Sequence, residues 1–159
     1  MACPFTVREL EEELAERIAA LDASPFDQNK DGLRPAAWRE ASIPLSVVDD
    51  ASPLEHLLFN VFVERSQNSE EHRDAPNGFA KVESTVLVLF VYNLRASDQL
   101  EDARLASDAA HAVVRALMAR DLAQLVDVRL VSAWRPLLSP DGRKLLAEVQ
   151  FLAVHDLPL

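Results

Sequence analysis

Residues 27–32 (DQNKDG) have the spacing of the first half of a calcium-binding loop. Asp27, Asn29 and Asp31 would supply oxygen ligands at alternate positions, and the glycine at the sixth position would allow a sharp turn around one hard cation. The twelfth position of such a loop, however, holds Trp38 where a bidentate glutamate belongs. A polar turn without metal is therefore the favoured interpretation, and calcium is the alternative.

Other chemistry-bearing patterns are absent from the sequence. The four histidines have no HExxH or similar metal-binding spacing, and no GxSxG motif or phosphate-binding glycine loop occurs. The lone cysteine, Cys3, excludes an internal disulfide and stands close to the amino terminus, which is a poor position for a nucleophile. We therefore expect no enzyme activity, no cofactor and no metal centre.

The composition indicates a globular domain with an acidic surface. The 159 residues suffice for one domain, and the net charge of −10 disfavours binding to nucleic acid by phosphate neutralisation. No run of 18 apolar residues occurs, so we expect no membrane span. The amino terminus carries charges where a signal peptide needs an apolar stretch, so we expect no export.

The sequence predicts a central strand followed by a long helix. Residues Val82–Leu94 (VESTVLVLFVYNL) are apolar on both faces, which is typical of a strand that is covered on both sides. The helix is expected over Asp98–Arg120, begun by a capping box between Asp98 and Glu101. Its predicted buried stripe comprises Leu100, Ala103, Ala106, Ala110, Val113, Val114, Leu117 and Met118.

An amphipathic helix is predicted near the amino terminus, over Thr6–Leu21. Thr6 and Glu9 have capping-box spacing, and the outer face is acidic. The following segment, Asp22–Pro53, contains four prolines and is expected to form an irregular arm, with a short strand near Ile43–Val48.

Three further strands are expected. Residues His56–Arg65 alternate between two faces, and the polar excursion Ser66–Lys81 then leads into the central strand. A strand over Leu125–Trp134 should stop at Pro136, and after a tight turn over residues 139–142 it should pair antiparallel with Lys144–His155. The expected fold is one α+β domain, residues 1–159, in which two helices pack on a small mixed or antiparallel sheet of four to five strands.

This order of elements resembles the phage tail terminator family, the minor tail protein U or tail-completion group, which includes related proteins of gene transfer agents and prophages. The likeness extends from Thr6 to His155. It rests on the first helix ending in Ala-Ala-Leu, the strand VLVLFVYNL, the helix segment VVRAL and the final strand segment VQFLAVH. The long arm Asp22–Pro53 departs from the family pattern.

The resemblance implies a structural virion protein rather than an enzyme. Such proteins form a hexameric ring on the head-proximal end of the tail tube, stop its polymerisation and present a surface to the head connector. DNA passes through the ring without sequence-specific binding. The implied location is the neck region of the virion tail, after synthesis in the host cytoplasm.

Candidate interface residues lie in three irregular segments. The arm, the excursion between strands and the turn after Arg135 contain aromatic and charged side chains suited to subunit or tube contacts. These candidates are Trp38, Glu70, Arg73, Asn77, Phe79, Arg135 and Asp141. For the aromatic members, as for Trp134, burial in the core is the competing interpretation.

Two other functions fit the same features. A head–tail neck or joining protein would have similar size and acidity. A non-viral acidic adaptor module is the other possibility, and it would not assemble into a ring. Oligomeric state and position in a particle separate these possibilities, whereas the sequence does not.

Overall fold

The computed structural model describes residues 6–28, 36–41, 56–70, 78–95, 97–118 and 127–159. The helices are α1 (Val7–Ala19), the short 3-10 helix η1 (Ser24–Phe26) and α2 (Gln99–Leu117). The strands are β1 (Arg39–Glu40), β2 (Leu58–Asn68), β3 (Phe79–Asn93), β4 (Asp127–Leu138) and β5 (Lys144–Pro158).

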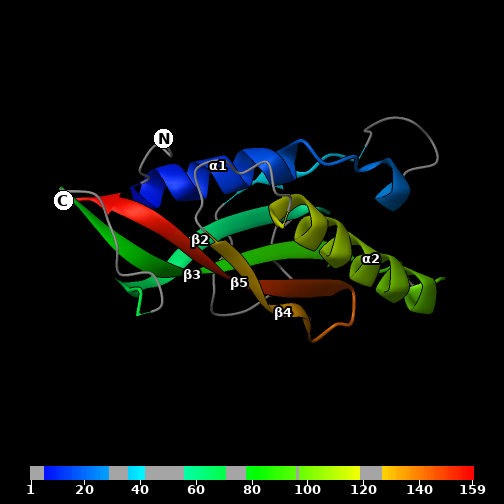
Figure 1. The fold of residues 1–159 in the computed structure, drawn as a ribbon. Coiled ribbons are helices and arrows are strands. Elements are labelled where there is room, and N and C mark those ends of the chain that lie inside the picture. Colours follow the sequence, from blue (N-terminus) through cyan, green and yellow to red (C-terminus); the bar gives the residue numbers. More distant parts are fainter. Residues whose placement is uncertain (1–5, 29–35, 42–55, 71–77, 96, 119–126) are drawn as a thin grey trace.

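The strands form one mixed sheet in the order β1-β2-β3-β5-β4. Only the β1–β2 pair among these is parallel, and the other three pairs are antiparallel. Figure 1 shows α1 and α2 on the same face of the sheet. The predicted α+β fold, with an N-terminal helix and one long central helix on a five-stranded sheet, is confirmed.

Strand β3 is central, as its sequence predicts. It pairs with β2 on one side and with β5 on the other, and residues 84–92 are buried without exception. Val86, Val88, Phe90 and Tyr92 belong to the main core beneath the helices, whereas Leu89 and Val91 join Leu146 in a smaller cluster. Each such side chain contributes about 2 kcal/mol of burial free energy, which fixes the pairing register on both faces.

The two helices begin differently. The capping box of α1 is confirmed, because Glu9 N donates to Thr6 Oγ1 at 3.2 Å and Thr6 N donates to Glu9 Oε2 at 2.8 Å. Asp98 stands at the N-cap of α2, but its side chain makes no capping hydrogen bond, so the box predicted with Glu101 is wrong. A carboxylate one residue further on, that of Asp102, is buried and binds the preceding loop instead.

Several strand ends differ from the prediction. Strands β2 and β3 continue to pair from Arg65 to Asn68, so the polar excursion is shorter than residues 66–81. Pro136 does not end β4, because β4 is an edge strand and tolerates the missing N–H. The short strand expected near Ile43–Val48 lies outside the described residues, and the observed short strand is β1.

Histidine His155 lies inside β5 rather than at its end. It is fully buried, and its Nε2 atom is 2.8 Å from Ser84 Oγ, which is in turn 2.7 Å from Ser66 Oγ. These hydrogen bonds compensate for the burial of the polar groups. Ser66, Ser84 and His155 therefore link β2, β3 and β5 through side chains, in addition to the apolar core.

Candidate functional site

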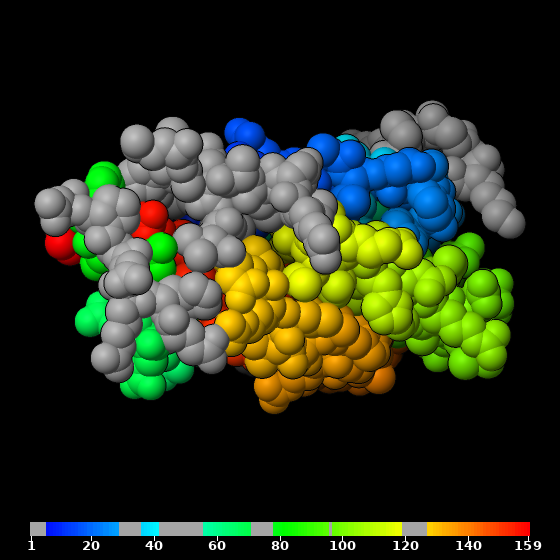
Figure 2. All heavy atoms as spheres, in the orientation of Figure 1, coloured from blue at the N-terminus to red at the C-terminus, as the bar shows by residue number. Residues whose placement is uncertain are grey.

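Exposed apolar side chains lie near the turn that joins β4 to β5, on both faces of the sheet. The exposed fractions of Leu100, Leu137 and Leu138 are 69%, 48% and 62%. Arg143, in the same turn region, has an 80% exposed side chain. We call these four residues the hairpin end. Figure 2 shows the orange β4 residues at the surface beside the green first turns of α2.

The β4–β5 turn is held by a compact set of hydrogen bonds. Gly142 N donates to Ser139 O at 2.9 Å, and Gly142 has φ +70°, a conformation that favours glycine. Asp141 Oδ1 accepts from Ser139 Oγ at 2.7 Å and from Arg143 N at 2.8 Å. The turn therefore presents its leucines and arginine from a defined backbone.

Helix α2 is attached to this turn through its first residues. Gln99 Nε2 lies 3.5 Å from Gly142 O, and Leu94 N donates to Arg143 O at 2.6 Å. These contacts place Leu100 next to the turn rather than over the core. Leu100 was predicted in the buried stripe of the helix, and this prediction is wrong because the first turn of α2 extends past the apolar face of the sheet.

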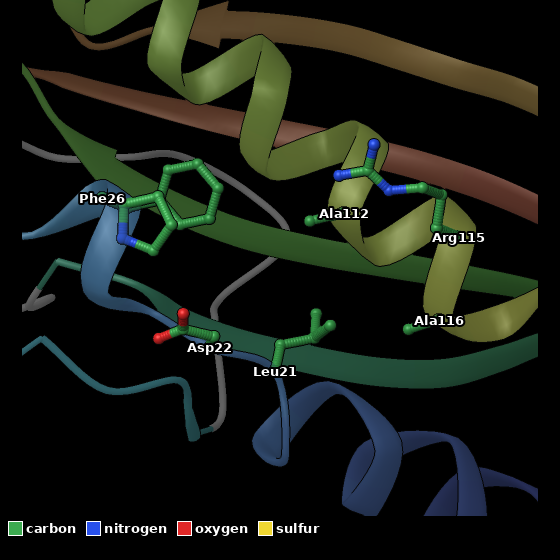
Figure 3. A pocket seen from close by; sticks show the side chains of 7 residues that line it. Leu21, Asp22, Phe26, Ala112, Arg115 and Ala116 are labelled. Carbon is green, nitrogen blue, oxygen red and sulfur yellow. The ribbon is translucent and has the colours of Figure 1, made fainter.

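A second feature is a groove of about 400 Å³ between η1 and α2. It is lined by Leu21, Asp22, Pro25, Phe26, Ala112, Arg115 and Ala116. Figure 3 shows the η1 side of the groove facing the three labelled α2 residues across the gap. We call it the η1–α2 groove. Its floor is apolar, and its rim carries one acidic and one basic side chain.

Local hydrogen bonds shape the η1 side of the groove. Asp22 Oδ1 accepts from Ser24 N at 3.0 Å and from Ser24 Oγ at 2.7 Å, and these bonds lower the pKa of Asp22. Phe26 is buried and packs edge-on against Trp38, with ring centroids 6.2 Å apart. The loop after α1 is thus anchored at both ends, and Asp22 stays ionised at the rim.

A polar junction connects the groove to β3. His56 Nε2 donates to Phe26 O at 2.8 Å, and Asn93 N donates to His56 Nδ1 at 3.2 Å. The imidazole also packs edge-on against Tyr92, with ring centroids 4.5 Å apart. These bonds define a neutral imidazole protonated on Nε2. Burial lowers the pKa of His56, and burial together with the Asp102 charge raises the pKa of Tyr92 to about 12.

An ion pair beside this junction fixes the start of α2. Asp102 is fully buried and accepts from Arg95 N at 2.6 Å, from Arg95 Nη2 at 2.6 Å and from Arg95 Nε at 3.1 Å. Burial alone would raise the pKa of Asp102, but the Arg95 hydrogen bonds and charge outweigh it, so the pKa is lowered. The junction and the ion pair therefore hold the groove and the hairpin end at fixed positions.

The predicted aromatic anchors differ in burial. Trp38 is 4% exposed and contacts Phe26, Phe59 and Phe90 edge-on, so its proposal as a surface anchor is wrong and the core interpretation holds. Trp134 is half-buried against the same core. Phe79 is half-buried at the start of β3, where it pairs with Pro158.

The charged candidates are distributed over the molecule. Arg135 is exposed on β4, 3.8 Å from Glu148, and Asp141 belongs to the hairpin turn beside Arg143. Glu70 is exposed just beyond the end of β2, at the end of the sheet opposite to that turn. Among the charged candidates within the described residues, Asp141 is the one that belongs to the hairpin turn itself. Candidates Arg73 and Asn77 lie outside the described residues.

The calcium-loop candidate is described only in part. Asp27 is exposed just after η1, whereas Asn29 and Asp31 lie outside the described residues. Within the described ranges, no group of three or more histidine, cysteine, aspartate or glutamate side chains has a metal-binding arrangement.

The hairpin leucines and the groove were not singled out from the sequence, although one signal was available. Leu137 and Leu138 are adjacent in a strand, so they must point to opposite faces, and at an edge strand at least one of them meets solvent. The groove had no sequence signal, because its lining comes from two segments about 90 residues apart.

The sequence matches no protein-family model, and it matches no curated protein. Among the described helices, none is both long and apolar enough to cross a membrane.

Proposed function

We propose that this chain is a structural assembly protein that resembles a tail terminator. In this proposal it forms a homo-oligomeric, hexameric ring that caps the head-proximal end of a tail tube, stops tube polymerisation and joins the tube to the head connector. The observation that carries the proposal is the hairpin end, where three leucines of one small domain face solvent. Exposed apolar side chains that gather at one end of a domain, here on both faces of the β4 edge, mark contact surfaces.

The rigidity of that surface supports an assembly role. The turn is held by its own hydrogen bonds, and α2 is fastened to it through Gln99 and to the loop before it through the Arg95–Asp102 pair. A preorganised surface loses little conformational entropy when a partner binds, which favours repeated contacts between identical subunits.

The charge of the chain is compatible with a conduit for DNA. Each copy carries a net charge of −10, and a ring of such copies would repel the phosphate backbone rather than bind it. DNA would then pass through the ring without sequence-specific contacts.

The direct test combines light scattering with negative-stain imaging, on the purified chain alone and mixed with tail tubes. A ring in solution, or a ring on one end of each tube that blocks further polymerisation, supports the terminator proposal. A ring that binds only connectors would indicate a neck protein. If the chain binds neither tubes nor connectors, this result would exclude the virion role and favour an acidic adaptor.

A further inference from the structure

Neither lateral edge of the described sheet is well suited to pairing with a strand of a second copy. On the β2 side, β1 pairs with Leu58 and Phe59, and the Glu11 carboxylate of α1 accepts from Val63 N at 2.7 Å. A side chain that occupies a strand's free N–H prevents another strand from pairing there. These contacts disfavour extension of the sheet by β4 of a second copy along the described part of this edge.

The opposite edge, β4, is also poorly suited to pairing with itself. Its register shifts twice, between Leu130 and Ser132 and between Ser132 and Arg135, and Pro136 has no N–H to donate. An antiparallel β4–β4 pair centred on Ser132 would also place Arg129 opposite Arg135, and like charges in that arrangement are unfavourable. Contacts between copies must then rely on side chains rather than on a shared sheet.

The side chains of the hairpin end and of the η1–α2 groove are complementary. The hairpin end offers Leu138, whose β5 partner Leu145 belongs to the core beneath the helices, and the groove offers an apolar floor and a volume of about 400 Å³. The hairpin turn carries Arg143 beside Asp141, and the groove rim carries Asp22 beside Arg115. Each acid can therefore face a base when one surface meets the other.

The surroundings of the groove add to this match. Helix α1, which leads directly into the groove loop, exposes Glu9, Glu12 and Glu16. Glu16, the one of these acids in the part of α1 next to the groove loop, would attract the exposed Arg143 of an approaching copy, whereas Glu12 is already 2.7 Å from Arg8.

We infer that the hairpin end of one copy docks into the η1–α2 groove of a second copy. The inference deepens the proposed function, because it names the subunit contact on which a ring would rest. The donor and acceptor patches are different parts of the chain, so the contact is head-to-tail and can repeat around a closed ring. A two-fold contact would instead use the same patch twice.

The test uses one variant for each patch. Leu138→Glu places a charge on the docking leucine, and Ala116→Arg fills the groove and adds positive charge at its rim. Leu159→Glu is the matched control for the first, because Leu159 is also exposed but lies at the opposite end of β5. Gln67→Arg, on an exposed part of β2, is the control for the second.

Native mass spectrometry and light scattering then measure assembly with and without tail tubes. We expect both patch variants to be monomeric and both controls to assemble like the original chain. We expect each patch variant to fold, because both substituted side chains are partly or fully exposed. Circular dichroism checks this expectation. Loss of assembly in the controls, or normal assembly of either folded patch variant, would overturn the inference.

Mixing the two patch variants distinguishes the symmetry of the contact. Leu138→Glu retains an intact groove and Ala116→Arg retains an intact hairpin end, so a head-to-tail contact predicts a 1:1 complex that cannot grow further. A hairpin-to-hairpin contact predicts instead that Ala116→Arg dimerises alone, and this result would refute the inference.

Failure of the inference and failure of the proposed function give different results. If the original chain caps tubes and both patch variants cap them equally well, the terminator proposal stands and the docking contact is refuted. If the 1:1 complex forms but no assembly binds tubes, the docking contact stands and the terminator proposal is refuted.

Discussion

At the scale of single residues, the Asp102 carboxylate depends on its hydrogen-bond partners, because it is a fully buried charge. It accepts hydrogen bonds from three N–H groups of Arg95, one of them in the backbone, whereas the Arg104–Glu101 pair on the same helix is exposed and 3.7 Å apart. A buried charge contributes only when its partners stay in place, and exposed pairs contribute little.

Asp102→Ala should therefore destabilise the fold by about 3 kcal/mol, because it leaves the Arg95 backbone N–H and part of its guanidinium without their acceptor. Chemical denaturation measures the change in the free energy of unfolding. Arg104→Ala is the control and should change it by less than about 0.5 kcal/mol. Equal effects of the two substitutions would contradict a structural role for the Asp102 pair.

His56 gives the fold a pH dependence with a defined sign. Burial lowers its pKa in the folded chain, although the Phe26 carbonyl and Asp102 oppose that shift, whereas an unfolded histidine titrates near about 6.5. The unfolded chain therefore binds the proton more tightly. The stability that neutral His56 contributes is complete above the unfolded pKa and is lost as the pH falls through the folded pKa.

We expect the free energy of unfolding to decrease between about pH 7.5 and about pH 5.5, and His56→Gln to reduce that slope. Protonation of Nδ1 removes the acceptor for Asn93 N, which is the physical reason for the loss. Urea unfolding at several pH values measures the slope. A variant with the slope of the original chain would show that other groups cause the pH dependence.

At the scale of elements, α2 shows how one helix serves both the core and the surface. Ala106, Ala109, Ala110, Val113 and Leu117 are buried, whereas Leu100 and Met118 at its two ends are exposed. Apolar side chains at both ends of the helix are therefore exposed, beyond the part of the core that the middle of the helix covers.

The same substitution at two positions of α2 separates these roles. Leu117 is 1% exposed, so Leu117→Asp should cost about 4 kcal/mol or more, because it buries an unpaired charge and removes a core side chain. Leu100→Asp should leave the melting temperature nearly unchanged, since an exposed acid in the first turn is compatible with the helix dipole. Thermal denaturation by circular dichroism compares the two, and similar melting temperatures would contradict this helix register.

Periodicity predicted the elements well because it reflects burial. The central position of β3, the α1 capping box, the β4–β5 hairpin and the helices on one sheet all follow from local apolar spacing and turn residues. The errors occur where a non-local contact decides. Asp102 is charged yet buried, because Arg95 supplies its hydrogen bonds. Leu100 is apolar yet exposed, because the first turn of α2 extends past the sheet.

The candidate surface was harder to predict than the fold. A groove between η1 and α2 exists only after both segments pack on the sheet, and no residue type in it has a distinctive spacing. Trp38 illustrates the opposite error, because a large aromatic in a proline-rich arm suits an anchor or a core equally until its neighbours are known.

At the scale of the whole molecule, net charge opposes assembly while the docking patches favour it. Each copy carries a net charge of −10, so identical copies repel one another over distances of about 10 Å at 0.1 M salt. The ion pairs inferred at the groove rim are exposed and would each contribute at most about 1 kcal/mol. Burial of Leu138 does not weaken as salt is added.

Self-association should therefore strengthen as salt rises from about 50 mM to about 500 mM. Screening weakens the repulsion between the net charges of the copies, and it weakens only a few exposed ion pairs at the groove rim. Sedimentation velocity at several salt concentrations measures the assembled fraction. Leu138→Glu should stay monomeric throughout, because screening cannot replace the lost apolar contact. Assembly that dissociates with added salt would contradict this balance and would assign the contact to the charged rim rather than to Leu138.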